Sequence, residues 1–182
     1  MLGIVFTEFL EMVEGSFSPE MADKLLETEG LSTGGVYTAV GNYPHSDMAK
    51  MVVRLSEELD VPIPDLLQAF GTYLFGQFVK GYPAFFEGVG SALDFLQGIE
   101  ERIHTEVRKL YPEAQLPGFT FERPAADHLI LHYSSERHLQ DLGLGLIKGC
   151  AQHFGEKIDV AITDSSTPEL AKVQFDLRAQ AA

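Results

Sequence analysis

Residues 128–137 read His-Leu-Ile-Leu-His-Tyr-Ser-Ser-Glu-Arg. Alternating apolar side chains are typical of a strand that buries one face. Because successive side chains of a strand point to opposite faces, one face should carry two leucines followed by polar groups: Leu129, Leu131, Tyr133, Ser135 and, if the extended backbone continues, Arg137. We therefore expect a strand here whose far end gathers two hydroxyls and a guanidinium.

Three other segments share this two-residue period. They are Phe119 with Phe121, residues 160–163 and residues 171–178. Between the second and third strands, residues 137–154 return to helical spacing and contain three glycines that allow close packing. The pattern predicts a four-stranded antiparallel sheet with one inserted helix.

The part of the chain before the sheet has helical spacing. Apolar residues recur at that spacing in residues 4–12, 21–26, 48–55 and 66–78. Ser91 is a typical N-cap, and we expect a long helix from there to about Tyr111, because Pro112 disfavours helical backbone before it. The order predicts an α+β fold in one domain, residues 1–182, with a helical lobe over about residues 1–62 and further helices plus the sheet over 63–182.

Composition excludes several kinds of partner. The chain has 13 basic and 27 acidic residues, a formal charge of −14, which repels nucleic acid and anionic membrane surfaces. No apolar run reaches the roughly 20 residues of a membrane span, and the N-terminus lacks a basic leader. Cys150 is the only cysteine, which excludes an intramolecular disulfide and a cysteine-based metal site. We expect a cytoplasmic protein.

The polar end of the 128–137 strand suits a bound carboxylate. The guanidinium of Arg137 forms a planar fork, and the hydroxyls of Tyr133 and Ser135 add hydrogen bonds. The anion would belong to a ligand whose apolar body rests on the leucines. In the alternative interpretation, Tyr133 and Ser135 cap the next helix and Arg137 forms a surface ion pair.

His104 lies at the rim of the apolar stripe of the expected 91–111 helix, so its imidazole can face the interior. It is either a core residue or a single axial ligand of haem iron, which needs one protein bond on that side. Zinc would need three or four ligands, and no second histidine or cysteine stands three or four residues after His104. We expect His128, His132 and His138 on a solvated surface.

His104, Pro117 and the stretch from Tyr133 to Arg137 together resemble the H-NOX family, the haem nitric oxide/oxygen-binding domains. Residues 81–86, 107–112 and 142–149 fit as well, so the resemblance runs from Met1 to the last strand. It implies ferrous haem b between a helical N-terminal lobe and a C-terminal lobe that contains the sheet. His104 would be the proximal ligand, Tyr133, Ser135 and Arg137 would hold the propionates, and Pro117 would distort the porphyrin.

The resemblance also bears on ligands and partners. Leu142 stands where oxygen-binding members carry a distal tyrosine, and the other expected distal residues are also apolar: Val5, Phe9, Leu74, Phe78 and Leu146. The implied ligands are nitric oxide and carbon monoxide rather than dioxygen. Since the chain carries no output segment, the implied partner is a sensor histidine kinase or a cyclic-di-GMP synthase or phosphodiesterase.

Three alternatives remain open. A small hydrolase could use Ser135 with His132 or His138 and Asp141, although His132 should project to the opposite face and no nucleophile elbow is present. A haem-free interaction module could keep the same fold. Within the family, an oxygen sensor is the third. We expect a sensor and not an enzyme.

Overall fold

The computed structural model describes residues 1–180. The chain forms seven α-helices within that range, and the first four contain the predicted helical segments: α1 (Gly3–Ser16), α2 (Pro19–Leu26), α3 (His45–Leu59), α4 (Ile63–Gly81), α5 (Ala92–Gln97), α6 (Thr105–Leu110) and α7 (Gln140–Phe154). A 3₁₀ turn (Pro83–Phe86) follows α4 and a π-helical segment (Glu100–His104) precedes α6. The strands are β1 (Gly118–Ala125), β2 (His128–Ser135), β3 (Ile158–Asp164) and β4 (Ala171–Ala179).

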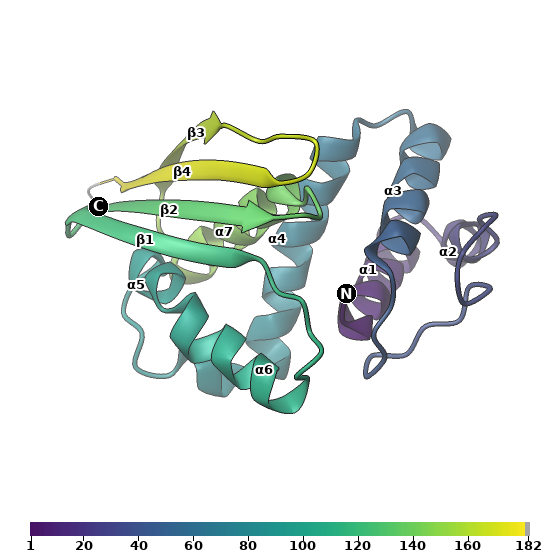
Figure 1. Ribbon diagram of the computed structural model, residues 1–182, viewed down its shortest axis with the longest axis horizontal. Helices are drawn as coiled ribbons and strands as arrows, with labels where there is room; N and C mark the ends of the chain where they lie inside the picture. The colour runs from purple at the N-terminus through teal and green to yellow at the C-terminus, as the bar shows by residue number, and fades with distance from the viewer. Residues whose placement is uncertain (181–182) are drawn as a thin grey trace.

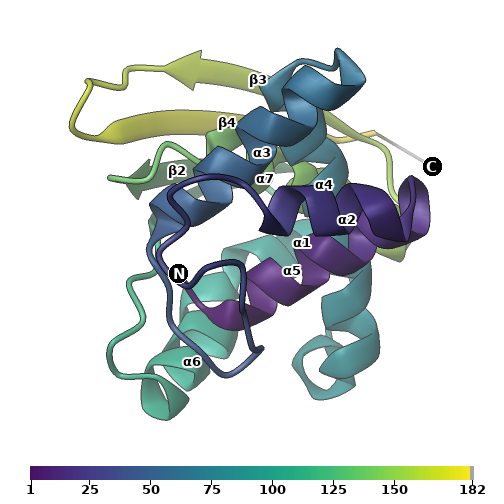
Figure 2. The same cartoon turned by 90° about the vertical axis from the view of Figure 1, so that its right-hand side faces the viewer.

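The molecule has two lobes joined through α4. In Figure 1 the sheet has α4 and α7 behind it and α5 and α6 below, while α1, α2 and α3 form a separate group beside them. Figure 2 shows this N-terminal group from its outer side. The predicted α+β class, with a helical lobe against a lobe that contains the sheet, is confirmed. None of the helices within residues 1–180 combines the length and the apolar character needed to cross a bilayer.

Each lobe has its own core, and α4 contributes to both. The N-terminal core is built mainly from α1, α3 and the first half of α4, around Phe6, Phe9 and Phe70, none of which is exposed. The sheet core lies between the inner face of the sheet and helices α5 and α7, and includes Phe75 of α4. Since burying one such side chain contributes about 1.5–3 kcal/mol, these cores carry most of the stability of each lobe.

All strand pairs are antiparallel, in the order β1-β2-β4-β3. Burial along β2 alternates as predicted, and Leu129 and Leu131 are fully buried. Tyr133 lies between Phe119 of β1 and Val173 of β4 in the register of the sheet. The inner face of the strands therefore ends in a group of aromatic side chains.

Helices α4 and α7 cross at very short distance because glycines face each other. A β-carbon added at Gly71 would lie 2.4 Å from the carbonyl oxygen of Leu142, and one at Gly145 would lie 2.2 Å from that of Gln68. Thr72 Oγ1 donates a hydrogen bond of 3.1 Å to the carbonyl of Gly145. This crossing sets the first turns of α7 against the middle of α4.

The loop between α2 and α3 is fixed by a buried carboxylate. Asp47 is 1% exposed, and its Oδ2 accepts hydrogen bonds from Ser32 N (3.0 Å), Ser32 Oγ (2.6 Å) and Tyr37 Oη (3.0 Å). Burial raises the pKa of Asp47, but the three donors outweigh it and hold that pKa below its usual range. The loop therefore packs against α3 although it forms no helix of its own.

The predicted single helix from Ser91 to Tyr111 is wrong. Ser91 does cap α5, since its Oγ accepts from Asp94 N at 3.1 Å, and the last turn does stop before Pro112. Between these ends, however, the helix is interrupted after Gln97 and continues as the π-helical segment, where the amide of Thr105 bonds to the carbonyl of Glu100. A π turn adds one residue and rotates the side chains that follow it.

Two further expectations need correction. The strand ends at Ser135, so Arg137 lies in the following turn and not on the strand. His128 and His132 do lie on the face opposite Tyr133, but His128 is not solvated: its side chain is 12% exposed and pairs with Asp176 at 3.0 Å.

Candidate functional site

Apart from tyrosine and cysteine, His104 and Asp47 are the two buried residues with polar side chains in the described chain, and His104 is 9% exposed. It lies at the end of the π-helical segment, a feature that often marks functional sites. Its Nδ1 is 2.8 Å from Glu100 Oε1, and Glu100 Oε2 accepts a 3.0 Å hydrogen bond from Arg108. The imidazole is therefore held by one ring nitrogen.

The electrostatics of this pair select one tautomer. Burial lowers the pKa of His104, although Glu100 opposes the effect, so the ring is neutral near pH 7. Burial raises the pKa of Glu100, but hydrogen bonds from His104 and Arg108 bring it below its usual range. An ionised carboxylate only accepts, so Nδ1 carries the proton and Nε2 keeps a free lone pair. Nothing in residues 1–180 hydrogen-bonds Nε2, which can therefore ligate a metal.

The ligand chemistry fits haem iron and not a protein-only metal site. No cluster of three or more His, Cys, Asp or Glu side chains that could hold a metal ion occurs in the described part of the chain. A zinc site needs three or four protein ligands, whereas haem iron needs one on its proximal side. His104, with its second nitrogen held by a carboxylate, matches the second requirement.

An aromatic path leads from His104 to the end of β2. The ring of Phe119 is centred 5.6 Å from that of His104 and 5.6 Å from that of Tyr133. Tyr133 is 4% exposed, and burial raises the pKa of its phenol. Pro117, half-buried, immediately precedes β1 in the same region. The structure thus links two predicted residues, His104 and Tyr133, through Phe119, and Pro117 lies two residues before Phe119 in the chain.

The hydroxyls of the motif order the turn that carries Arg137. Ser135 Oγ accepts from the amide of Arg137 at 3.2 Å, and Tyr133 Oη accepts from the amide of Leu139 at 3.3 Å. The predicted alternative, in which both hydroxyls organise the start of the next helix, is therefore met in part. Both hydroxyls can still donate their own protons to an acceptor.

Arg137 has no carboxylate partner among residues 1–180 within ion-pair distance. Its guanidinium donates to the neutral Gln115 Oε1 at 3.3 Å, and burial lowers its pKa. Its charge also contributes, after burial, to a lowered pKa of His45. A partly buried cation of this kind suits an incoming carboxylate.

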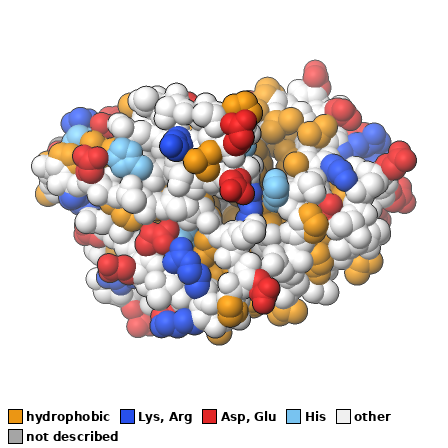
Figure 3. All heavy atoms as spheres, in the orientation of Figure 1, with side chains coloured by type: hydrophobic (Ala, Val, Ile, Leu, Met, Phe, Trp, Pro, Cys, Tyr) orange, Lys and Arg blue, Asp and Glu red, His pale blue; other side chains and the backbone are white. Residues whose placement is uncertain are grey.

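A cleft between the two lobes opens beside this guanidinium. It has a volume of about 370 Å³ and takes its lining from both lobes: Met1, Asn42, Tyr43 and Pro44 on one side, and Glu113, Gln115 and Arg137 on the other. The space-filling view in Figure 3 shows the molecule hollowed at the junction of the lobes. An acidic group could therefore reach Arg137 from solvent.

The predicted distal residues converge on the N-terminal core. Phe9 and Leu74 are members of the N-terminal core, and the other four pack against that core: Val5, Phe78, Leu142 and Leu146. Leu146 also packs against the sheet core, so the group borders the junction of the lobes. None of the six carries a hydrogen-bond donor, whereas Tyr73, which packs against the same core, does. We expected the apolar body of a ligand to rest on Leu129 and Leu131. This expectation is wrong, because both leucines are enclosed in the sheet core.

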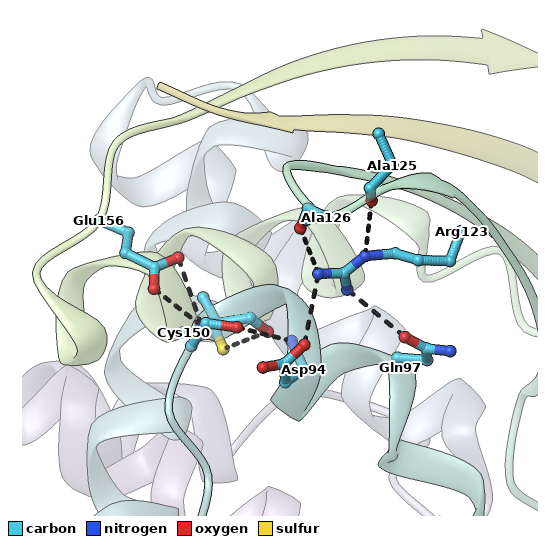
Figure 4. A network of polar contacts seen from close by, with 9 residues as sticks. Asp94, Gln97, Arg123, Ala125, Ala126, Cys150 and Glu156 are labelled. Carbon is cyan, nitrogen blue, oxygen red and sulfur yellow. Dashed lines mark hydrogen bonds and ion pairs between the residues drawn. The ribbon is translucent and has the colours of Figure 1, made fainter. Parts of the chain in front are cut away.

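The segment that leads to His104 is anchored to the sheet at its start. Arg123 of β1 bonds to Asp94 (3.3 Å) and Gln97 (3.4 Å) of α5, and also to the carbonyls of Ala125 and Ala126 (Figure 4). At the N-terminus of α5, the amide of Ala92 donates to the carboxylate of Glu156. The carbonyl of Ala92 accepts a hydrogen bond from Cys150 Sγ at 3.7 Å. The chain before the π-helical segment is thus fixed to β1 and to the end of α7.

The hydrolase alternative is wrong on geometry. His132 pairs with Glu122 on the open face of the sheet, and His138 Nε2 bonds to the carbonyl of Pro168. Asp141 accepts from Gln68 of α4 at 3.1 Å. Within residues 1–180 neither histidine hydrogen-bonds to Ser135, so the three predicted residues do not form a triad there.

Three residues of the site escaped the sequence analysis: Glu100, Gln115 and Phe119. Glu100 had a usable signal, since a glutamate four residues before a histidine on a helix can reach it. Gln115 lies in an irregular segment, where no sequence pattern indicates its neighbours. Phe119 was predicted in a strand but not as a neighbour of His104.

Comparisons with known proteins agree with this geometry. The sequence profile of the haem-NO-binding (HNOB) family matches residues 2–162. The Fe(II) unliganded H-NOX protein from K. algicida is 35% identical with a TM-score of 0.92, over 100% of this chain and 98% of that one. The Fe(II)NO H-NOX protein from S. oneidensis is 28% identical with a TM-score of 0.88, over the whole of both chains. H-NOX from Shewanella woodyi in its Fe(II)CO state is 37% identical with a TM-score of 0.83, over 99% and 95%.

Proposed function

Because the chain belongs to the haem-NO-binding family, and is thus a haem-binding sensor domain rather than an enzyme, we propose that His104 binds the iron of ferrous haem b between the two lobes. The observation that carries the proposal is the buried imidazole of His104, whose Nδ1 is held by Glu100 and whose Nε2 has no hydrogen-bond partner among residues 1–180. Haem, when bound, supplies the iron atom that takes up the gas. Residues 1–182 act as one haem-binding domain in this proposal.

Tyr133, Ser135 and Arg137 hold the haem propionates. The support is the guanidinium of Arg137, which is partly buried beside the cleft and meets only a neutral amide. A carboxylate there would gain charge-assisted hydrogen bonds. The hydroxyls of Ser135 and Tyr133, which accept from the amides of Arg137 and Leu139, can donate further ones. Pro117, which immediately precedes β1, presses on the porphyrin.

The gases sensed are nitric oxide and carbon monoxide, and dioxygen is not retained. The polarity and hydrogen-bond donors of a distal pocket decide which gases a haem protein holds. Leu142 and the other five predicted distal residues offer no donor, and all six meet at the N-terminal core. Two of the similar structures, from S. oneidensis and Shewanella woodyi, are in Fe(II)NO and Fe(II)CO states.

The sensor regulates a separate signalling protein, either a sensor histidine kinase or a cyclic-di-GMP synthase or phosphodiesterase. The support is the two-lobed construction. Both lobes line the cleft beside Arg137 and both contribute to the predicted pocket, so a change at the cofactor can alter how the lobes are set against each other.

The test is an absorption spectrum of the purified, haem-reconstituted and reduced protein, first under argon, then in air, then with nitric oxide or carbon monoxide. We expect a Soret band that air leaves unchanged and that either gas shifts. His104→Gly should change the spectrum of the reduced protein, and added imidazole should restore it. The absence of a Soret band after reconstitution would refute the proposal. A persistent spectrum of the ferrous–dioxygen complex in air would refute the predicted selectivity and point to Tyr73.

A further inference from the structure

Glu100 joins His104 to a cation. One carboxylate oxygen meets His104 Nδ1 at 2.8 Å and the other accepts from Arg108 at 3.0 Å. The Glu100 side chain is 25% exposed, so this bridge is only partly screened by solvent, and Arg108 holds it from the outer side. The imidazole, the carboxylate and the guanidinium form a chain of three groups that ends at Nε2.

Each link of this chain changes the electron density at Nε2 in a known direction. A carboxylate that accepts the Nδ1 proton makes the imidazole a stronger electron donor toward a metal. A guanidinium on the same carboxylate draws charge away from it and weakens that effect. Glu100 and Arg108 therefore act with opposite sign.

We infer that Glu100 and Arg108 set the strength of the bond between His104 and the haem iron, Glu100 strengthening it and Arg108 moderating it. The inference rests on the proposed function, because it requires His104 to be the ligand. Glu100 reaches the imidazole by a hydrogen bond to Nδ1, and Arg108 reaches it through Glu100. Both are positioning residues that act through the imidazole.

The same helical stretch provides matched controls. Glu106 and Lys109 pair with each other at 2.6 Å, and both are well exposed. Neither bonds to His104 or Glu100 in the described chain, so Glu106→Gln and Lys109→Gln change the same charges on the same helix without touching the bridge. They separate an effect of the hydrogen-bond chain from a general effect of charge near the haem.

The experiment measures the iron–histidine stretching band of the reduced, unliganded holoprotein by resonance Raman spectroscopy. Glu100→Gln keeps a hydrogen-bond acceptor and loses the charge, so it should lower the stretching frequency, and Glu100→Ala should lower it further. Arg108→Gln should raise it. The haem reduction potential should move in the opposite sense, upward for Glu100→Gln and downward for Arg108→Gln, each by more than in its control.

The outcomes distinguish the inference from the proposed function. If His104→Gly removes the band while Glu100→Gln and Arg108→Gln leave its frequency at the wild-type value, His104 is the ligand and the inference is overturned. Shifts equal to those of the two controls overturn it as well. If the wild-type band persists in His104→Gly, the proposed ligand itself is wrong. Arg108 is half-exposed, so its variant tests the inference even if Glu100→Ala fails to fold.

Discussion

Arg137 should stabilise the haem complex and destabilise the apoprotein. In the structure its guanidinium is partly buried and meets only Gln115, so its charge is not compensated by a carboxylate in the described chain. With haem bound it would pair with a propionate. Arg137→Ala therefore removes a charge-assisted contact from the complex, but only a desolvated charge from the apoprotein.

The size of the effect follows from the kind of bond. A hydrogen bond to a charged group contributes about 1.5–3 kcal/mol, which corresponds to roughly a 10- to 150-fold change in affinity. We expect Arg137→Ala to release haem faster by a factor in that range. The melting temperature of the apoprotein should stay the same or rise, since an unpaired, partly buried charge opposes folding.

The assay follows haem transfer to an excess of a haem-scavenging apoprotein by absorbance, together with thermal unfolding of the haem-free protein by circular dichroism. Arg178→Ala is the control, because Arg178 lies on the open face of the sheet and pairs with Asp176 at 3.2 Å. Haem release at the wild-type rate from Arg137→Ala would refute the propionate contact. A large loss of apoprotein stability would show that Arg137 supports the fold instead.

Three other changes test the fold and the pocket. Asp47→Asn should cost about 1.5–3 kcal/mol of unfolding free energy at neutral pH. Because the folded-state pKa of Asp47 is lowered, this contribution is lost as pH falls below about 4. Urea unfolding should therefore show a smaller stability difference between wild type and variant at about pH 3 than at about pH 7. Gly145→Ala, whose β-carbon would lie 2.2 Å from the Gln68 carbonyl, should cost about 1–3 kcal/mol in the same assay, whereas Gly143→Ala, with nothing within 4 Å, should not destabilise. Leu142→Tyr places a hydroxyl among the distal residues and should produce an air-dependent shift of the Soret band, and a spectrum indifferent to air would count against the placement of Leu142.

Burial periodicity explains why most elements were predictable. Along β2 every second residue is enclosed, so Leu129 and Leu131 identify the inner face without knowledge of its partners. The 91–111 segment shows where this reasoning fails. Leu96 is buried, but Leu110, an apolar residue near the end of the same predicted helix, is 75% exposed, and both the break after Gln97 and the π turn lie between them. An extra residue in one turn leaves no mark in a pattern of apolar spacing.

The contacts of the site depend on how β1 and β2 pair, which the sequence pattern of either strand alone does not determine. At the hairpin end, Ala125 pairs with His128, and a regular ladder from that pair would set Phe119 opposite Ser134, on the open face of the sheet. An irregularity between Glu122 and Ala125 shifts the register by one residue. Since such a shift moves side chains to the other face, Phe119 instead lies opposite Tyr133, where it connects that residue to His104. The apolar alternation of β1 identifies its inward face but not which residue of β2 lies opposite Phe119. The aromatic path from the predicted iron ligand to the predicted propionate motif therefore depends on a register irregularity that the sequence does not locate.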